Sequence, residues 1–555
     1  MKIRSKKSVG AVALAAALIA FAAYQATQWN DPWMSWAHVE AVDTRHFLQQ
    51  VLKDGWSPRL LESILNGAGI DTAIRFRPLS HATHLLDAAV GSRLLSLWFT
   101  PVLVNASSLI YFVACPILAI FIARRMLGTT AAATIAGLVA IGALLTSTGY
   151  VSAGIFVFHP AKKLVVTGVL LQLLLFVAYL QLPRAGIATL IGLCQLLLAW
   201  SDESGLFTGL MISGIAGIFA LAHRRLPDLL RLASFVALTV TILVGRALSG
   251  TPAAIDPTQK PVDLTTALQP LLSLRLFGPF TMPGEHFGGH IDVRWNQGET
   301  LFNIVLEHLE GAFSMLYGPP FVRWLVLFGM VATAMAMVAL LSGIGASRAN
   351  PARGEAKRSG WLFLAASGLL LAGVISSVLL LNFGGRLFMS SYNFYYASFL
   401  PVLAFFTTLA AFAVSMAAVG AEAPALKLLG RAIQACLGIA MAASIASNVE
   451  NVPRLDRLTA MIHYNPYSYG QVNVAAATHR PGGAVRIAQC TPEDMKHRFD
   501  RLLGELDVRN PGTRADFLYY PSRPFVDARF LKRYLEMLLK QEPDIEFYPA
   551  RPGEC

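Results

Sequence analysis

Long apolar runs recur along this chain and constrain its fold more than any other feature of the sequence. A helix of about 17 to 25 predominantly apolar residues is long enough to cross about 30 Å of hydrocarbon. About eleven runs meet this criterion, and they cover residues 8–28, 97–121, 129–150, 164–182, 185–200, 205–221, 232–248, 321–341, 361–383, 396–419 and 432–449. The sequence therefore predicts an α-helical polytopic membrane protein with about eleven transmembrane helices.

The overall composition agrees with a membrane protein. The 555 residues are 55% hydrophobic and only 14% charged, whereas a soluble domain has about 25% charged residues. The sequence contains no CxxC, HExxH, Walker A or GxGxxG pattern, so a nucleotide-hydrolysing machine is not indicated. Cys490 and Cys555 both follow the last apolar run. An oxidising compartment would permit a disulfide between them, and the sequence leaves that pairing open.

Basic residues predict the orientation of the chain, because lysine and arginine in short loops are retained on the cytoplasmic side. With the N-terminus inside, every expected inner segment is basic, including Arg124, Arg125, Arg224 and Arg225. This topogenic bias accounts for much of the net charge of +12 without a nucleic-acid partner. Three large segments are then expected outside, in the periplasm if the membrane is a bacterial inner membrane; they are residues 29–96, 249–320 and 450–555.

The last of these segments, residues 450–555, reads as a small outer domain separate from the transmembrane region 1–449. Short β-prone stretches alternate in it with longer amphipathic ones, which is typical of an α/β unit. Strands are expected at 484–489, 516–520 and 545–548, and helices at 492–506 and 526–540. The role of this domain stays open between a substrate lid, a partner surface and a simple cap.

Three acidic residues follow the first apolar helix and are candidates for a catalytic base. Asp31 emerges between Trp29 and Trp33, which suit the membrane interface, while Glu40 and Asp43 lie further along the same outer segment. A carboxylate held there can accept the proton of a substrate hydroxyl. The alternatives are structural: an acid before proline often caps a helix, and Asp43 can be explained by solvation or by pairing with a nearby arginine.

Basic side chains on the expected outer side are candidates for binding a phosphate. Arg75 and Arg77 flank a phenylalanine before a proline, and arginine suits bidentate capture of phosphate. His159, Lys162 and Lys163 occupy a short outer turn, where they break the positive-inside pattern. Surface arginines and lysines that snorkel to the interface are the competing interpretations.

Further candidates lie at other outer turns. Asp202 and Glu203 stand side by side between two apolar arms, where acids are costly unless they are paired or functional. Arg246 closes the seventh run, and Arg386 precedes a group of tyrosines that includes Tyr392. An arginine with nearby tyrosines could hold a phosphate and stack a sugar, although tyrosines also anchor helices at the interface.

The layout resembles the GT-C superfamily of integral-membrane glycosyltransferases, to which the dolichyl-phosphate-mannose-protein mannosyltransferases belong. Those proteins also begin with a first transmembrane helix, which a large acid-bearing outer loop and many further spans follow. Some members also have an outer C-terminal domain. Unlike the commonest members, this chain has no acid doublet in its first outer loop. The matching elements are Asp31 or Asp43, the run Arg77-Pro78-Leu79, His159-Pro160, the Asp202-Glu203 turn, and Arg386 with its tyrosines.

The resemblance implies an inverting transferase that takes a sugar from a polyprenyl-phosphate donor. The acceptor would be an envelope glycan, a lipid or a protein at the outer face of the membrane. Asp31 or Asp43 would be the general base, with Glu40 nearby, and a set of basic residues would stabilise the phosphate leaving group: Arg75, Arg77, Lys162, Lys163, Arg246 and Arg386. The acids leave room for a divalent metal, but no ligand spacing requires one.

Two other functions fit the same layout. A flippase or transporter of polyprenyl-linked lipids would also be polytopic, but such proteins often carry internal repeats and charges near the membrane midplane. A non-catalytic membrane component of a glycan assembly system would keep the fold without using the acids. The sugar, the acceptor, the identity of the base and the oligomeric state are not readable from the sequence.

Overall fold

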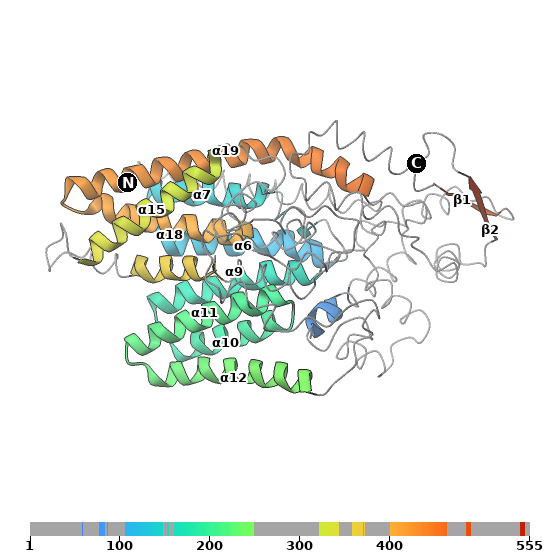
Figure 1. Ribbon diagram of the computed structural model, residues 1–555, viewed down its shortest axis with the longest axis horizontal. Coiled ribbons are helices and arrows are strands. Elements are labelled where there is room, and N and C mark those ends of the chain that lie inside the picture. Colours follow the sequence, from blue (N-terminus) through green and yellow to red (C-terminus); the bar gives the residue numbers. More distant parts are fainter. Residues whose placement is uncertain are drawn as a thin grey trace, which may run out of the picture.

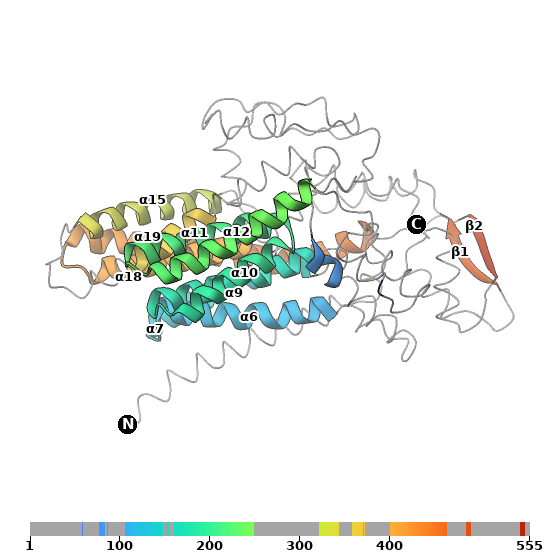
Figure 2. The same ribbon diagram turned by 90° about the horizontal axis from the view of Figure 1, so that it is seen from below.

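The computed structural model shows a bundle of long helices that lie side by side along the longest axis of the molecule (Figures 1 and 2). It describes residues 58, 77–83, 86, 106–147, 150, 153–154, 160–248, 321–342, 358–369, 371, 400–462, 484–489 and 544–549. The labelled helices are α6 (Ala106–Leu127), α7 (Ala131–Thr146), α9 (Pro160–Gln181), α10 (Ala185–Ala199), α11 (Glu203–Ala222), α12 (Leu226–Leu248), α15 (Phe321–Ser342), α18 (Leu400–Gly420) and α19 (Pro424–Ile462). Residues 78–83 and 358–369 are also helical.

Within the described residues, six helices are long and apolar enough, by length and composition, to cross a membrane. They belong to α6, α9, α11, α15, α18 and α19, while α7 and α10 are shorter apolar helices. These are the helices of an integral membrane protein, as the sequence predicts. The first expected span, 8–28, lies outside the described residues, and α12 is not among the six.

Several helices end elsewhere than the hydropathy of the sequence indicates. Helix α6 continues to Leu127, past the expected end at residue 121, and α7 ends at Thr146. Helix α19 is 39 residues long, begins at Pro424 and reaches Ile462, so it continues into the stretch expected to start the outer domain. Apolar composition marks the hydrocarbon-compatible part of a helix, whereas the helix itself can continue through polar residues.

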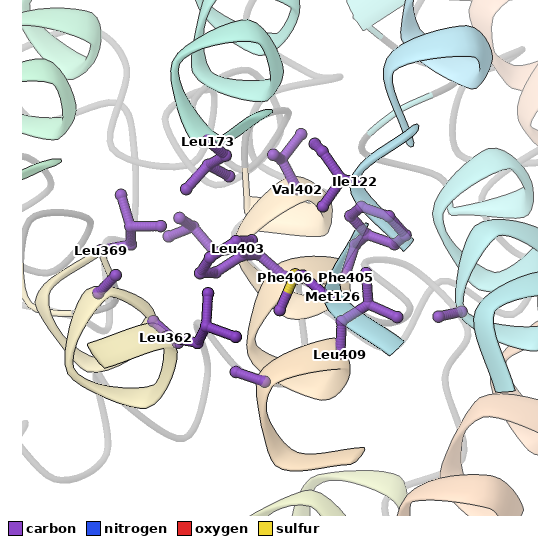
Figure 3. Close-up of a cluster of buried hydrophobic side chains, with 14 of the residues drawn as sticks. Ile122, Met126, Leu173, Leu362, Leu369, Val402, Leu403, Phe405, Phe406 and Leu409 are labelled. Carbon is purple, nitrogen blue, oxygen red and sulfur yellow. The ribbon is translucent and has the colours of Figure 1, made fainter. Parts of the chain in front are cut away.

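Helix α18 lies at the centre of one part of the bundle. Its apolar stretch Pro401–Gly420 is 83% buried, and the helix contacts α6, α7, α15 and α19. Figure 3 shows its side chains Phe405, Phe406 and Leu409 meeting residues of other helices, among them Ile122 and Met126 of α6. A helix that is apolar on all sides is stable only when it is surrounded, and α18 fits that requirement.

Helices α9 to α12 form the neighbouring part of the bundle, and a buried amide joins three of them. The Gln172 Nε2 of α9 donates to the carbonyls of Ile191 in α10 and Gly209 in α11, at 3.3 and 3.2 Å. It also lies 3.3 Å from the hydroxyl of Ser213. Interhelical hydrogen bonds of this kind hold transmembrane helices together where lipid offers no alternative partner.

A buried carboxylate fixes the turn between α11 and α12. Asp228 accepts hydrogen bonds from the Tyr179 hydroxyl of α9 at 3.0 Å, from Arg225 Nε at 2.8 Å and from Arg231 Nη1 at 3.3 Å. Asp228 is only 4% exposed, so these donors replace the water that it gives up. The contact ties the end of α9 to the beginning of α12.

Tyr179→Phe is therefore expected to lower the free energy of unfolding by about 1.5 kcal/mol, the usual contribution of a hydrogen bond to a charged group. The phenyl ring would keep the packing of Tyr179 against Phe219, whose ring centroid lies at 5.6 Å. Thermal unfolding of the purified protein in detergent measures the effect. An unchanged transition would mean that the two arginines alone satisfy Asp228.

Two short strands lie near the C-terminus. β1 (Val485–Gln489) and β2 (Ile545–Pro549) pair in parallel, with Arg486 opposite Glu546. Both strands were expected, at 484–489 and 545–548, and a parallel pair requires a crossover connection. The other predicted elements of the outer α/β domain fall in 490–543, outside the described residues, so the domain itself stays a prediction.

Candidate functional site

Charged side chains gather where α6, α9 and α11 begin, and we call this end of the bundle the site end. Asp202 lies at the N-cap of α11, where its carbonyl accepts the amide of Leu206 at 2.9 Å. The Asp202 side chain is 0% exposed. A buried carboxylate is costly unless charged or hydrogen-bonding groups surround it, so its neighbours define the site.

Two cationic side chains from different segments approach Asp202. Lys162 stands in the first turn of α9. Its Nζ lies 2.8 Å from Asp202 Oδ1, and its side chain is 3% exposed. The Arg77 Nη1 lies 3.5 Å from Asp202 Oδ2, and the Arg77 side chain is 16% exposed. The buried amine of Lys162 therefore has a carboxylate as its counter-ion.

Lys163 extends the same cluster toward α6. Its Nζ lies 3.2 Å from the Ser107 hydroxyl, and both residues are buried. Neighbouring residues on a helix point about 100° apart, which follows from 3.6 residues per turn. The two adjacent lysines therefore reach different partners, the α10–α11 turn and the first turn of α6.

The segment that carries Arg77 is held against the end of α10. The amide of Leu79 donates to the Trp200 carbonyl at 3.2 Å, and the amide of His81 donates to the Arg77 carbonyl at 3.2 Å. Pro78 begins the helical residues 78–83, a position that suits proline because no amide is needed there. In both views this short blue helix lies beside the site end of α9, α10 and α11 (Figures 1 and 2).

The backbone adds to the positive character of the site end. The N-termini of α6, α9 and α11 meet here, as the contacts of Ser107, Lys162 and Asp202 require. Each helix N-terminus acts as about half a positive charge and favours anions. Two cationic side chains, Lys162 and Arg77, thus lie against one carboxylate, and a third, Lys163, lies at the same end, where three helix N-termini meet.

We name this group of residues, which are Arg77, Lys162, Lys163, Asp202 and Ser107, the basic cluster. Four of its five members were predicted separately from the sequence, and the fold brings them together. Ser107 was not predicted, because it stands inside the expected span 97–121. The polar run Asn105-Ala106-Ser107-Ser108 at that place is the only signal that pointed to it.

The other predicted site residues are placed less fully or not at all. Glu203 is the first residue of α11, and Arg246 lies in the last turn of α12, at the same end of the bundle in both views. The remaining candidates lie outside the described residues: Asp31, Glu40, Asp43, Arg75, His159, Arg386 and Tyr392.

The metal that the sequence left open gains no site from the described residues. Within them, no group of three or more histidine, cysteine, aspartate or glutamate side chains could hold a metal ion. The acids of the first outer segment, Asp31, Glu40 and Asp43, lie outside that set. The chemistry of the basic cluster itself is that of an anion site, because it presents amines and a guanidinium.

The described part of the chain defines a helical membrane protein that carries a buried, mainly cationic cluster where three of its helices begin. No family model, curated protein or solved structure matches the chain.

Proposed function

We propose that this chain is a membrane glycosyltransferase that transfers a sugar from a polyprenyl-phosphate donor to an acceptor at the outer face of the membrane. The acceptor is an envelope glycan, a lipid or a protein. The observation that carries the proposal is the basic cluster, in which Lys162 and Arg77 lie against one buried carboxylate and Lys163 bonds to Ser107 at the same end of the bundle. The phosphate of the polyprenyl-phosphate sugar is an anion, and the basic side chains of this cluster can bind it at the level of the lipid headgroups.

In the proposed mechanism the basic cluster stabilises the leaving group. Negative charge grows on the polyprenyl phosphate as the bond to the anomeric carbon breaks, and preorganised cations favour that charge. Asp202 orients the Lys162 amine, through the contact of 2.8 Å, before the donor arrives. Asp31 or Asp43 removes the proton of the acceptor hydroxyl, which attacks the opposite face of the sugar and inverts its configuration.

The proposal includes a topology. It has about eleven spans, a cytoplasmic N-terminus, outer loops at 29–96 and 249–320, and an outer α/β domain at 450–555 in an inner membrane. Basic loops on one side support this orientation. It places the basic cluster on the outer side, where a lipid-linked sugar would present its phosphate. A cysteine introduced at Glu450 should then react with a membrane-impermeant reagent added from outside, and reaction only from the cytoplasmic side would contradict the orientation.

Release of free polyprenyl phosphate tests the proposed reaction. The purified protein is supplied with polyprenyl-phosphate sugars, and the wild type is compared with Asp31→Asn and Asp43→Asn. Loss of a general base is expected to reduce turnover about 10²- to 10⁴-fold in one of the two variants. No release with any donor, from protein shown to be folded, would contradict the transferase. Transbilayer movement of the donor without bond cleavage would instead support a flippase.

A further inference from the structure

Arginine side chains gather at the end of the bundle opposite the site end. Contacts join the helix ends there: Arg125 Nη1 lies 3.3 Å from Gln181 Oε1, and Tyr179 of α9 reaches Asp228 of α12 at 3.0 Å. The exposed or half-exposed arginines on these ends form what we call the arginine surface, which consists of Arg124, Arg125, Arg184, Arg224, Arg225 and Arg231.

Asp228, the acid beside these arginines, does not neutralise the outer side of the arginine surface. Asp228 is 4% exposed and is already bonded to Tyr179, Arg225 and Arg231. Among the described residues, Arg124, Arg184 and Arg224 make no ion pair, and all three are exposed. The surface that faces outward from the helix ends is therefore cationic.

Arg224 occupies a backbone position that suits glycine. Its φ is +55°, and it is the only non-glycine residue of the described set with a positive φ. The amides of Arg224 and Arg225 donate to the carbonyls of Leu221 and Ala220, which is the Schellman pattern that ends a helix. Gly128, with φ +86°, ends α6 by the simpler αL motif, in which its amide donates to the Arg124 carbonyl at 3.0 Å. A strained residue is a reason to look for a role of its side chain.

We propose that the arginine surface binds the headgroup phosphates of acidic phospholipids in the adjacent leaflet, with Arg224 as a central contact. Guanidinium groups bind phosphate in a bidentate manner, and basic residues at the ends of transmembrane helices attract anionic lipids. The apolar side chains Leu221, Leu226 and Leu230 beside the turn are 62%, 58% and 58% exposed, so acyl chains can lie next to them. This binding is independent of the proposed transferase activity.

The backbone strain at Arg224 makes a sharp test possible. Arg224→Gly removes the charge but suits the positive φ, so the fold should be at least as stable as the wild type. Phosphatidylglycerol is titrated into the protein in neutral detergent, with phosphatidylcholine and inorganic phosphate as comparisons, and binding is followed by native mass spectrometry. One arginine near a headgroup corresponds to about a fivefold change in affinity.

The wild type is expected to bind phosphatidylglycerol more tightly than phosphatidylcholine. The affinity for phosphatidylglycerol should be about fivefold weaker in Arg224→Gly and should be retained in Arg224→Lys. The unfolding transition of Arg224→Gly should be unchanged or higher, which separates lost charge from lost fold. Equal binding of the two lipids, or unchanged binding by Arg224→Gly, would overturn the proposal. Full displacement of phosphatidylglycerol by inorganic phosphate at the same concentration as the lipid would also overturn the proposal, because the surface would then bind a free anion and not a lipid headgroup. The assay contains no sugar donor, so its outcome does not depend on the transferase.

Discussion

Replacing Lys162 with methionine is expected to lower the free energy of unfolding by about 3–5 kcal/mol, the usual effect of removing one partner of a buried ion pair. The Nζ of Lys162 lies 2.8 Å from Asp202 Oδ1, and the two side chains are 3% and 0% exposed. Water cannot replace the lost amine readily at such a site. Arg77, at 3.5 Å from the other carboxylate oxygen, compensates only in part.

The double variant Lys162→Met with Asp202→Leu separates stability from function. A buried ion pair can often be replaced by apolar side chains of similar size without loss of stability, so the double variant should regain most of what Lys162→Met loses. It should nevertheless release polyprenyl phosphate at least about 100-fold more slowly than the wild type, because the cation at the leaving group is gone. Stability is measured by titration with SDS in mixed micelles, and turnover by phosphate-lipid release.

Lys427→Gln is the matched control for these variants. Lys427 lies in the first turn of α19 and is exposed. Its loss should therefore change the free energy of unfolding by less than about 0.5 kcal/mol and leave turnover unchanged. Full turnover in the Lys162→Met, Asp202→Leu protein would contradict the role proposed for the basic cluster. A double variant as unstable as Lys162→Met would show that the lysine stabilises the fold through contacts other than Asp202.

The four charged members of the basic cluster could be chosen from the sequence because charges at a membrane boundary are expensive. Lys162 and Lys163 break the positive-inside pattern, and Asp202 interrupts two apolar arms. Their pairing could not be predicted. Residues 77, 162 and 202 are far apart in the chain, and only the packing of α9 against α10 and α11 brings them within ion-pair distance.

The helix ends were predicted less well, for a physical reason. Hydropathy identifies residues that tolerate hydrocarbon, but a helix continues for as long as its backbone bonds can be made. Helix α19 therefore extends to Ile462 through polar residues and Pro453, whereas the apolar signal ends at residue 449. Ser107 was missed because a small hydroxyl residue barely lowers the mean hydropathy of an apolar run.

The buried polar contacts within the bundle were also invisible to sequence patterns. Gln172 and Asp228 fall in or beside apolar runs and bond to helices that are distant in the chain. A pattern along one helix indicates which side chains are polar, but not which neighbour satisfies them. Such contacts depend on helix order and rotation, which a single sequence does not provide.

Gly205→Ala is expected to destabilise the protein by about 3 kcal/mol, at the upper end of the usual range for overpacking. A Cβ added at Gly205 would lie 2.5 Å from the Leu198 carbonyl oxygen, which is backbone and cannot rotate away. The two residues hold the tight α10–α11 turn that presents Asp202. The variant should therefore also displace Asp202 from Lys162 and reduce turnover, as measured by SDS titration and phosphate-lipid release.

Gly214→Ala, in the same helix, is the control and should act in the opposite direction. Nothing lies within 4 Å of a Cβ added there, and the position is exposed. Alanine in place of glycine in a helix interior stabilises by about 0.5–1 kcal/mol. If both variants unfolded at the same denaturant concentration, close approach of α10 and α11 would not explain Gly205. A stable Gly205→Ala protein with normal turnover would mean that the turn can open without disturbing Asp202.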